Sequence, residues 1–218
     1  NIKSHVNTIK YLSEHNNNIS GRVAEIRDEI IQHIGATADE IPFIGELIRL
    51  KDDEREWESA IERILHNFAL RLIVPEKYYR KVNEYVNNHN LRGRIVYQRY
   101  NYDAALREFV NRHAQDNSLL NKIEFKPNAQ YIDWIEDRLY SEFNYTCVDT
   151  LEDFNHINEK AVTKEGLIKA KGGKHEKDDR PEISRREHYV LGWDNREKIA
   201  AIKKEYDNLC RQVKAKNK

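Results

Sequence analysis

The sequence predicts an α/β domain held between two coiled-coil arms. Near both ends of the chain, apolar residues recur at alternating steps of three and four, the spacing of a left-handed coiled coil. Between the ends, β-rich runs alternate with amphipathic helical patterns, which is typical of α/β layer packing. Two terminal seams can pair only if the middle of the chain folds back. We therefore expect an antiparallel coiled-coil stub, formed by the N- and C-terminal helices, that closes a compact domain.

The two arms have matching seams. The first helix is predicted over residues 5–34, ending before Gly35, and the second begins after Asp194, which is expected to cap it. The predicted seam residues are Ile19, Val23, Ile26 and Ile30 in the first arm and Ile199, Ile202, Tyr206, Leu209 and Val213 in the second. Val6, Ile9 and Leu12 continue the first stripe outward, with the polar Asn16 inside it. The arms then span residues 1–34 and 194–218, and residues 35–193 form the domain.

The first half of the domain, about residues 41–100, has a clear β-α-β-α-β rhythm. Strands are predicted over residues 46–50, 68–74 and 94–100, and helices over residues 52–67 and 76–88. Pro75 stops the second strand, since proline cannot continue a ladder of hydrogen bonds. The first helix carries Trp57, Ile61 and Leu65 on one face, and the second has the same three-or-four spacing. This half alone predicts strands packed against helices.

The second half, about residues 119–192, repeats the alternation in shorter pieces. Helices are predicted over residues 104–113, 131–143 and 151–155, an extended run over 119–125, and strands over 145–148, 162–169 and 189–191. Residues 170–187 are polar, charged and glycine-bearing, so we expect a loop there. The two halves are therefore predicted to be related in structure.

Composition limits the classes of function. The formal net charge is zero, so no overall field draws the chain toward DNA or a membrane. Two cysteines argue against a disulfide scaffold and favour a reducing cytoplasm. No apolar run approaches the roughly 20 residues of a membrane span, so no membrane partner is expected. The chain has no methionine and begins at Asn1, which suggests an internal segment of a longer protein.

Short motifs in both halves occur in a recognisable order. They are Gly45-Glu46-Leu47-Ile48, Ala60-Ile61, Leu72-Ile73-Val74 and Gly93-Arg94 in the first half, and Cys147-Val148-Asp149-Thr150-Leu151-Glu152, Val162-Thr163 with Gly166, and Gly172-Gly173 in the second. In this order and spacing they resemble the two halves of an SMC-type hinge domain. The resemblance covers about residues 41–173. It implies a hinge-like α/β fold of two pseudo-related halves, homodimerisation through the hinge, and no cofactor in this segment.

A narrower resemblance adds three stretches. They are residues 41–48 (IPFIGELI), 174–180 (KHEKDDR) and 189–195 (YVLGWDN). These look like the SMC-like ATPase subunit of Wadjet plasmid-defence systems, a relative of MukB-type condensins. The resemblance implies a parent protein with an ATPase head, other subunits in the same complex, and action on double-stranded DNA that a partner nuclease then cleaves. The segment itself has no G-x-x-x-x-G-K-[ST] motif, so we expect it not to be an enzyme.

Glycines are the candidate interface residues. Close approach of two backbones is easier without a Cβ, and positive φ angles are open to glycine. Gly172 and Gly173, next to the predicted strand 162–169, are expected to leave a strand edge free for a second copy, and Gly166 is a further candidate for the interface. The alternative is that the pair simply forms a turn.

Basic residues in the second half are the candidate DNA contacts. Residues 160–186 carry nine basic and five acidic side chains, a local excess in a neutral chain. Lysines near phosphates release counterions and give salt-sensitive, sequence-independent binding. The candidates are Lys164, Lys169, Lys171, Lys174 and Arg180. The alternative is a solvated loop.

Catalytic and metal sites are weaker interpretations. Residues 175–179 (HEKDD) place carboxylates in one loop, whereas a two-metal nuclease gathers them from several elements, so a salt-bridge network is favoured. Cys147 and Cys210 lack histidines or cysteines at zinc-ligand spacing, and Cys147 in an apolar strand is predicted to be buried. We therefore predict neither a metal nor a catalytic residue.

Other functions stay open at this point. One is the hinge of a chromosome-maintaining SMC or MukB-type condensin. Another is a small nuclease or nucleotide-binding enzyme with helical extensions, and a third is a DNA-binding module that does not dimerise.

Overall fold

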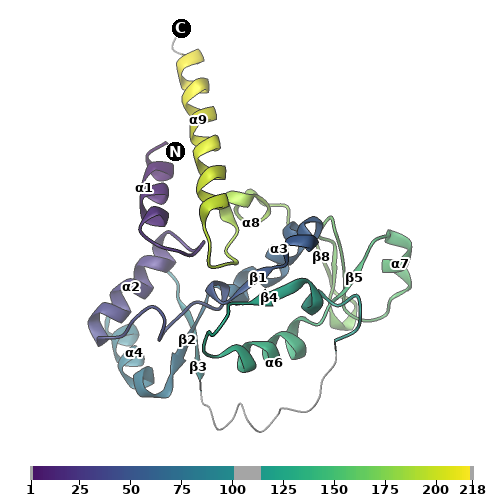
Figure 1. The fold of residues 1–218 in the computed structure, drawn as a ribbon, viewed down its shortest axis with the longest axis horizontal. Helices are drawn as coiled ribbons and strands as arrows, with labels where there is room; N and C mark the ends of the chain where they lie inside the picture. The colour runs from purple at the N-terminus through teal and green to yellow at the C-terminus, as the bar shows by residue number, and fades with distance from the viewer. Residues whose placement is uncertain (1, 101–113, 217–218) are drawn as a thin grey trace.

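The computed structural model describes residues 2–100 and 114–216, and Figure 1 shows two arm helices rising from a mixed α/β body. The helices are α1 (Ile2–Ser13), α2 (Arg22–Ile34), α3 (Glu58–Ala69), α4 (Glu76–Asn88), α6 (Ile132–Phe143), α7 (Leu151–His156), α8 (Pro181–Ser184) and α9 (Arg196–Lys216). The strands are β1 (Ile48–Leu50), β2 (Arg71–Pro75), β3 (Val96–Tyr100), β4 (Ile123–Phe125), β5 (Thr146–Val148), β6 (Ala161–Thr163), β7 (Ile168–Lys169) and β8 (His175–Glu176). The helix predicted over residues 104–113 lies outside the described residues.

The first half has the predicted β-α-β-α-β order. Strands β2 and β3 are parallel, with Leu72 opposite Tyr97, and α4 makes the crossover between them. Helix α4 has the predicted bounds because Pro75 ends β2 and stands as its N-cap. The second predicted strand begins later than expected, since Phe68 and Ala69 are the last apolar residues of α3.

One pairing joins the two halves. Strand β1 of the first half runs antiparallel to β4 of the second, with Arg49 opposite Glu124. Residues 119–122 form a 3-10 turn, so the extended run predicted over residues 119–125 is confined to β4. The halves are therefore not separate units: they share a strand pair and one large hydrophobic core.

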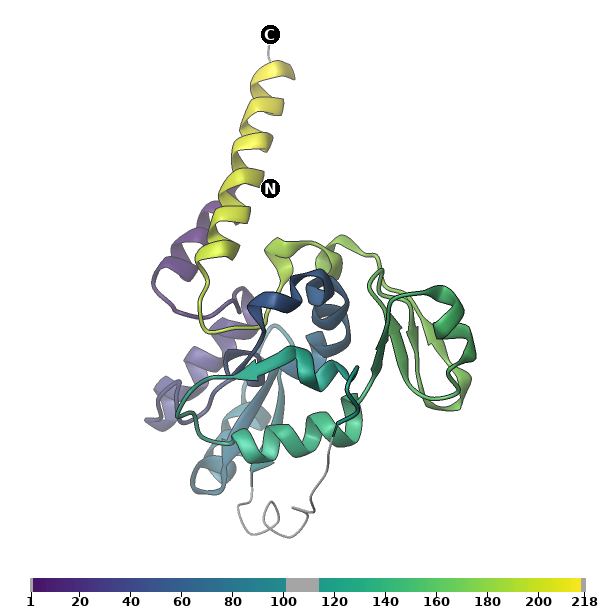
Figure 2. The same cartoon turned by 45° about the vertical axis from the view of Figure 1, so that its right-hand side comes forward.

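The second half ends in a small lobe, which we define as residues 146–179. Its sheet has the order β5-β6-β7-β8, with β5 and β6 parallel and the other pairs antiparallel. Val148, Phe154 and Ala161 form a core of its own under α7. Figure 2 shows the lobe at one side of the body, joined to it by extended segments.

Three predictions in this region are wrong. The single strand over residues 162–169 is two strands, β6 and β7, joined by a turn at Gly166, whose φ is 82°. The loop over residues 170–187 contains β8, α8 and a 3-10 turn. The strand over residues 189–191 does not form, because the backbone N–H groups of Val190 and Leu191 donate to the carboxylate of Glu62 at 3.0 and 3.1 Å and not to a neighbouring strand.

The arms also differ from the prediction. Residues 5–34 are two helices, because residues 14–21 leave the helix at an asparagine-rich stretch and Gly21 takes a φ of 78°. Helix α1 alone packs against α9, running antiparallel to it, so that both termini lie at one end (Figure 1). Helix α2 packs against α4 in the body. The antiparallel stub thus exists with a shorter first arm.

The predicted seam residues are divided by this break. All four residues proposed for the first arm lie outside α1: Ile19 is in the loop, and Val23, Ile26 and Ile30 are on α2 against the main core. On α1, Leu12 is buried and Ile9 is half-buried, whereas Val6 is exposed. On α9, Ile202 is buried, whereas Ile199, Tyr206 and Leu209 are half-buried and Val213 is exposed. No helix within the described residues combines the length and apolar character of a membrane span.

Candidate functional site

The glycine pair forms the turn of the β7–β8 hairpin. Gly172 and Gly173 have φ angles of 80° and 81°, and the backbone N–H of Ala170 donates to the Lys174 carbonyl at 2.8 Å across the turn. Nothing lies within 4 Å of a Cβ placed at either glycine. The pair therefore serves the turn and does not expose an edge on β7, because β8 covers that edge.

The exposed edge lies instead on β8. Hydrogen-bonded and non-hydrogen-bonded pairs alternate along an antiparallel ladder. Because Ala170 and Lys174 form a hydrogen-bonded pair, Lys169 and His175 form the next, non-hydrogen-bonded one. The backbone N–H and carbonyl of His175 consequently face away from β7, on the open side of the sheet. Both residues of β8 are exposed.

Gly166 is not part of that edge. It is buried, and the guanidinium of Arg63 from α3 covers it, so that a Cβ there would lie 2.1 Å from Arg63 Nη1. Arg63 also donates to the Glu165 carbonyl and pairs with Asp179, each at 2.9 Å. Gly166 therefore seats the lobe on the body of its own chain, apart from Gly172 and Gly173.

Two of the five candidate DNA-binding residues, Lys164 and Lys169, are half-buried and bound to other groups of the chain. Lys164 pairs with Asp149 at 2.7 Å and with Glu56 at 3.0 Å. The Nζ of Lys169 donates to the carbonyls of Phe154 and Ile157, which closes the end of α7. These two ammonium groups hold the lobe together and are not presented to a phosphate.

The other three candidates are exposed around the hairpin. Lys171 lies at the turn, Lys174 pairs with Glu176 at 2.9 Å, and Arg180 forks onto Asp178. Arg180 holds the pKa of Asp178 down at about 2. The exposed basic charge is therefore smaller than the sequence suggests, because neighbouring carboxylates offset most of it.

The carboxylates of residues 175–179 are ion-paired. Asp178 pairs with Arg180, and Asp179 pairs with Lys177 and with Arg63. Within residues 2–100 and 114–216, no group of three or more histidine, cysteine or acidic side chains could hold a metal ion. Cys147 is buried on β5, and desolvation raises the pKa of its thiol to about 12.

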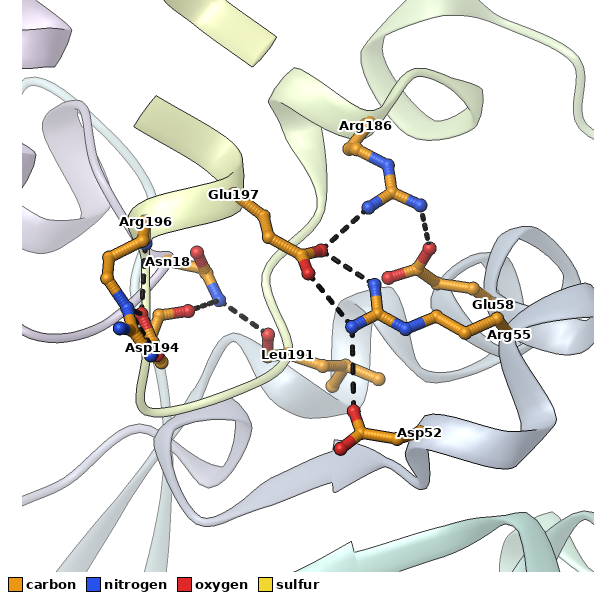
Figure 3. Close-up of polar contacts among 9 residues, drawn as sticks. All are labelled: Asn18, Asp52, Arg55, Glu58, Arg186, Leu191, Asp194, Arg196 and Glu197. Carbon is orange, nitrogen blue, oxygen red and sulfur yellow. Dashed lines mark hydrogen bonds and ion pairs between the residues drawn. The ribbon is translucent and has the colours of Figure 1, made fainter. Parts of the chain in front are cut away.

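A second polar site lies where the arms meet the body. A pocket of about 530 Å³ opens beneath the first turn of α9. Figure 3 shows Glu197 of α9 accepting from two arginines at once: Arg55 at 2.7 and 2.9 Å and Arg186 at 2.8 Å. Arg186 also donates to Glu58 of α3. This network ties the start of α9 to the body on its solvent side.

Behind that network lies a buried acid and base. Glu62 of α3 and Lys198 of α9 are 4% and 6% exposed. Burial raises the pKa of Glu62 to about 7, an effect that the hydrogen bonds from Val190 and Leu191 oppose, and burial lowers the pKa of Lys198 to about 8. Lys198 donates to the backbone carbonyls of Asn18 and Tyr189, the latter at 2.7 Å.

Sequence reasoning missed this junction. Its buried polar side chains are Asn18, Glu62, Asn195 and Lys198. One signal was available: Asn16-Asn17-Asn18 followed by Gly21 interrupts an otherwise apolar stripe, and asparagine and glycine disfavour helix interiors. Nothing in the sequence sets Glu62 and Lys198 apart, since each is one of several charged residues in an amphipathic helix.

No protein-family model and no curated sequence matches the chain, but solved structures do. The crystal structure of an asymmetric dimer of the Geobacillus stearothermophilus SMC hinge domain is 18% identical at a TM-score of 0.53, covering 99% of this chain and 89% of that one. The Pyrococcus furiosus Smc hinge domain with an extended coiled coil is 18% identical at 0.50, with 98% and 77% covered.

A third similar structure is the folded elbow of cohesin. It is 15% identical at a TM-score of 0.53, and the match covers 97% of this chain and 30% of that one. Identities this low establish similarity of architecture alone. The chain has the fold of an SMC hinge domain.

Proposed function

We propose that this chain is the hinge through which two copies of an SMC-like protein associate, and that its role is binding and not catalysis. The exposed edge of β8 is the observation that supports this proposal most directly. A strand edge carries unpaired backbone donors and acceptors that a second chain can complete. Edges of this kind are normally covered or paired, so an open one at the tip of a well-formed sheet is suited to a partner.

The β8 edge is suited to a second copy of the same chain. Among the described residues, β3 pairs with β2 alone, so its other edge lies in the first half as the β8 edge lies in the second. We propose that β8 of one copy adds to β3 of its partner. A two-fold axis then makes the same contact twice, which closes the dimer.

The first test is the absolute mass of the purified chain by light scattering over a concentration series. The chain has a mass of 26.0 kDa, so the proposal expects about twice that value. A strict monomer at high concentration would remove dimerisation as the function and leave the fold unchanged.

A proline at position 175 tests the edge itself. His175→Pro removes the N–H that faces the open side and keeps the hydrogen bonds to β7. Lys174 already has φ −68° and ψ 129°, a conformation that a following proline accepts. His175→Ala is the matched control, because it removes the same side chain and retains the N–H. The proposal expects a monomer for proline and a dimer for alanine. If both variants are dimers, the interface lies elsewhere.

The hairpin turn gives an independent check. Gly172→Glu and Gly173→Glu place a charge beside the edge, whereas Gly172→Asn keeps a residue that tolerates positive φ. We expect the glutamate variants to weaken association and the asparagine variant to leave it intact. An unchanged oligomeric state in all three would exclude the turn from the interface.

We further propose that the parent protein acts on double-stranded DNA in bacterial plasmid defence, together with other subunits and a partner nuclease in the cytoplasm. The resemblance of residues 41–48, 174–180 and 189–195 to the Wadjet subunit supports this proposal. The test is plasmid loss in cells that carry the complete system with a His175→Pro or a His175→Ala hinge. Retained plasmids with proline alone support the proposal. Equal plasmid loss in both strains contradicts a role for the β8 edge in defence, plasmids retained in both strains contradict the defence role, and a chromosome-segregation defect would favour the condensin alternative.

Direct DNA contact by this segment is proposed only for the exposed Lys171, Lys174 and Arg180. Replacing Lys171 and Lys174 by glutamate should weaken duplex binding at low salt, measured by fluorescence anisotropy. The same change at Lys164 and Lys169 would disturb the lobe, so it is not an informative test. Unchanged affinity would exclude the hairpin from DNA binding.

A further inference from the structure

The loop between α1 and α2 is more buried than its composition suggests. Residues 14–21 contain neither helix nor strand, and three of them in succession are asparagines. Polar loops of this kind usually lie on the surface and move. Here Asn18 is 7% exposed and Ile19 is 1% exposed. A polar segment buried this deeply needs partners for its backbone and side-chain groups.

The partners come from the other arm. The Nδ2 of Asn18 donates to the carbonyls of Leu191 and Asp194 at 2.6 and 3.1 Å, in the segment that leads into α9 (Figure 3). The loop at residues 14–21 and the segment that leads into α9 therefore lie within hydrogen-bonding distance of each other, although more than 170 residues of sequence separate them.

Asn195 makes the reverse connection. From the base of α9, its Nδ2 faces the carbonyls of Leu12 at 2.6 Å, Asn17 at 3.1 Å and also His15. Its two N–H groups are shared among these three acceptors. The last carbonyls of a helix have no partner within the helix. Asn195 therefore supplies one for the end of α1 and continues into the loop that follows.

Two buried charges anchor the paired loops to the body. Lys198 donates to the carbonyl of Asn18 in the first loop and to that of Tyr189 in the second. Glu62 on α3 accepts from the backbone of Val190 and Leu191. Both loops are thus fixed to each other and to a helix of the body.

We propose that Asn18 and Asn195 form a reciprocal clasp that sets the direction in which the paired α1 and α9 leave the hinge body. The break between α1 and α2 would otherwise be a flexible joint. With the clasp closed, a movement of the arm pair reaches the body as a rigid rotation and is not absorbed at the junction. The inference concerns one chain, so it is independent of dimerisation.

Asn195→Asp tests the clasp. The substitution keeps the shape and sets a carboxylate against three carbonyl oxygens, which repels it. Asn16→Asp is the matched control, with the same change of charge at an exposed position of the same loop. The direction of the arms is read from spin-label distances by pulsed electron resonance. One label sits on the native Cys210 of α9, and in a second series, which carries Cys210→Ser, a label at Val6→Cys of α1 takes its place. Lys81→Cys on α4 provides the reference.

Wild type and Asn16→Asp should each give one narrow distance distribution. Asn195→Asp should broaden both the α9 and the α1 distances, although it changes one residue of the second arm. Narrow distributions for folded Asn195→Asp would overturn the proposal. Hydrogen exchange of α3 and β2 reports whether the body is intact. If Asn195→Asp loses this protection from exchange, Asn195→Ala replaces it. Narrow distance distributions for Asn195→Ala would equally overturn the clasp.

Discussion

The arm junction and the β7–β8 hairpin use polar side chains in opposite ways. At the junction, Asn18, Asn195 and Lys198 are 6–7% exposed and bind backbone carbonyls. In the hairpin, Lys174 and Glu176 pair with 71% and 54% of their side chains exposed. A buried group that loses its partner keeps its desolvation cost, whereas water replaces the partner of an exposed one. The junction is therefore built to stay in one arrangement, and the hairpin can exchange its contacts for those of a partner.

The largest expected effect is at Lys198. Lys198→Ala leaves the carbonyls of Asn18 and Tyr189 without their donor and Glu62 without its nearby positive charge, so we expect a loss of about 3–5 kcal/mol in the free energy of unfolding. Lys203→Ala, exposed on the same helix, should change it by less than about 0.5 kcal/mol. Urea denaturation measures both. Equal losses would show that the buried contacts of Lys198 stabilise the fold no more than an exposed lysine does.

The next effect depends on pH. The folded state raises the pKa of Glu62 from 4.5 to about 7, so it holds this proton more tightly than the unfolded chain does. Glu62 therefore makes stability fall as pH rises from 4.5 to 7, by on the order of 3 kcal/mol. Lys198, with a pKa lowered from 10.5 to about 8, makes it rise between 8 and 10.5.

Glu62→Gln isolates the acid branch of this profile. The difference in unfolding free energy between wild type and Glu62→Gln should change steadily from pH 4.5 to 7 and level off above 7. Titrating groups that do not interact with Glu62 cancel in that difference. Two parallel profiles over this range would show that Glu62 titrates normally.

Two glycines with nearly the same positive φ sharpen the comparison within the lobe. Gly166 and Gly172 have φ angles of 82° and 80°, but only Gly166 is covered, by Arg63. Gly166→Ala should cost about 2 kcal/mol or more, from backbone strain and displaced Arg63. Gly172→Ala should cost about 1 kcal/mol, from strain alone. Thermal unfolding compares the two, and equal shifts would mean that Arg63 moves without cost.

The smallest effect is expected on the solvent side of the junction. Glu197 is 58% exposed although it binds both Arg55 and Arg186. Glu197→Gln should lower the unfolding free energy by less than about 1 kcal/mol, and the difference should shrink in about 1 M salt. A loss as large as that of Lys198→Ala would show that the exposed network contributes as much to the unfolding free energy as the buried contacts do.

The local sequence pattern was sufficient to predict many of the helices and strands of the body. Helix α4 has the predicted bounds because Pro75 marks its start and its apolar residues keep helical spacing. The order β1-α3-β2-α4-β3 also follows from alternating propensities along the chain. The glycines and motifs of both halves predicted the hinge fold that the solved structures share.

The same kind of pattern was misleading in the first arm. Leu12 and Ile19 are seven residues apart, a full heptad, and both are buried. Ile19, however, lies in the loop and packs in the main core. The apolar spacing therefore continued across a break in the helix, and the asparagines between the two residues were the better indicator.

Sequence pattern alone predicted the order of helices and strands in the first half and the pairing of two terminal helices, because these depend on residues only a few positions apart. Tertiary structure alone decided which polar groups are buried and which strand edge stays open. Asn195 meets Leu12 across 183 positions, and the backbone N–H of Val190 donates to Glu62 across 128. Whether such a group is paired or solvated depends on which segments the whole fold brings together, and no local window of sequence contains that information.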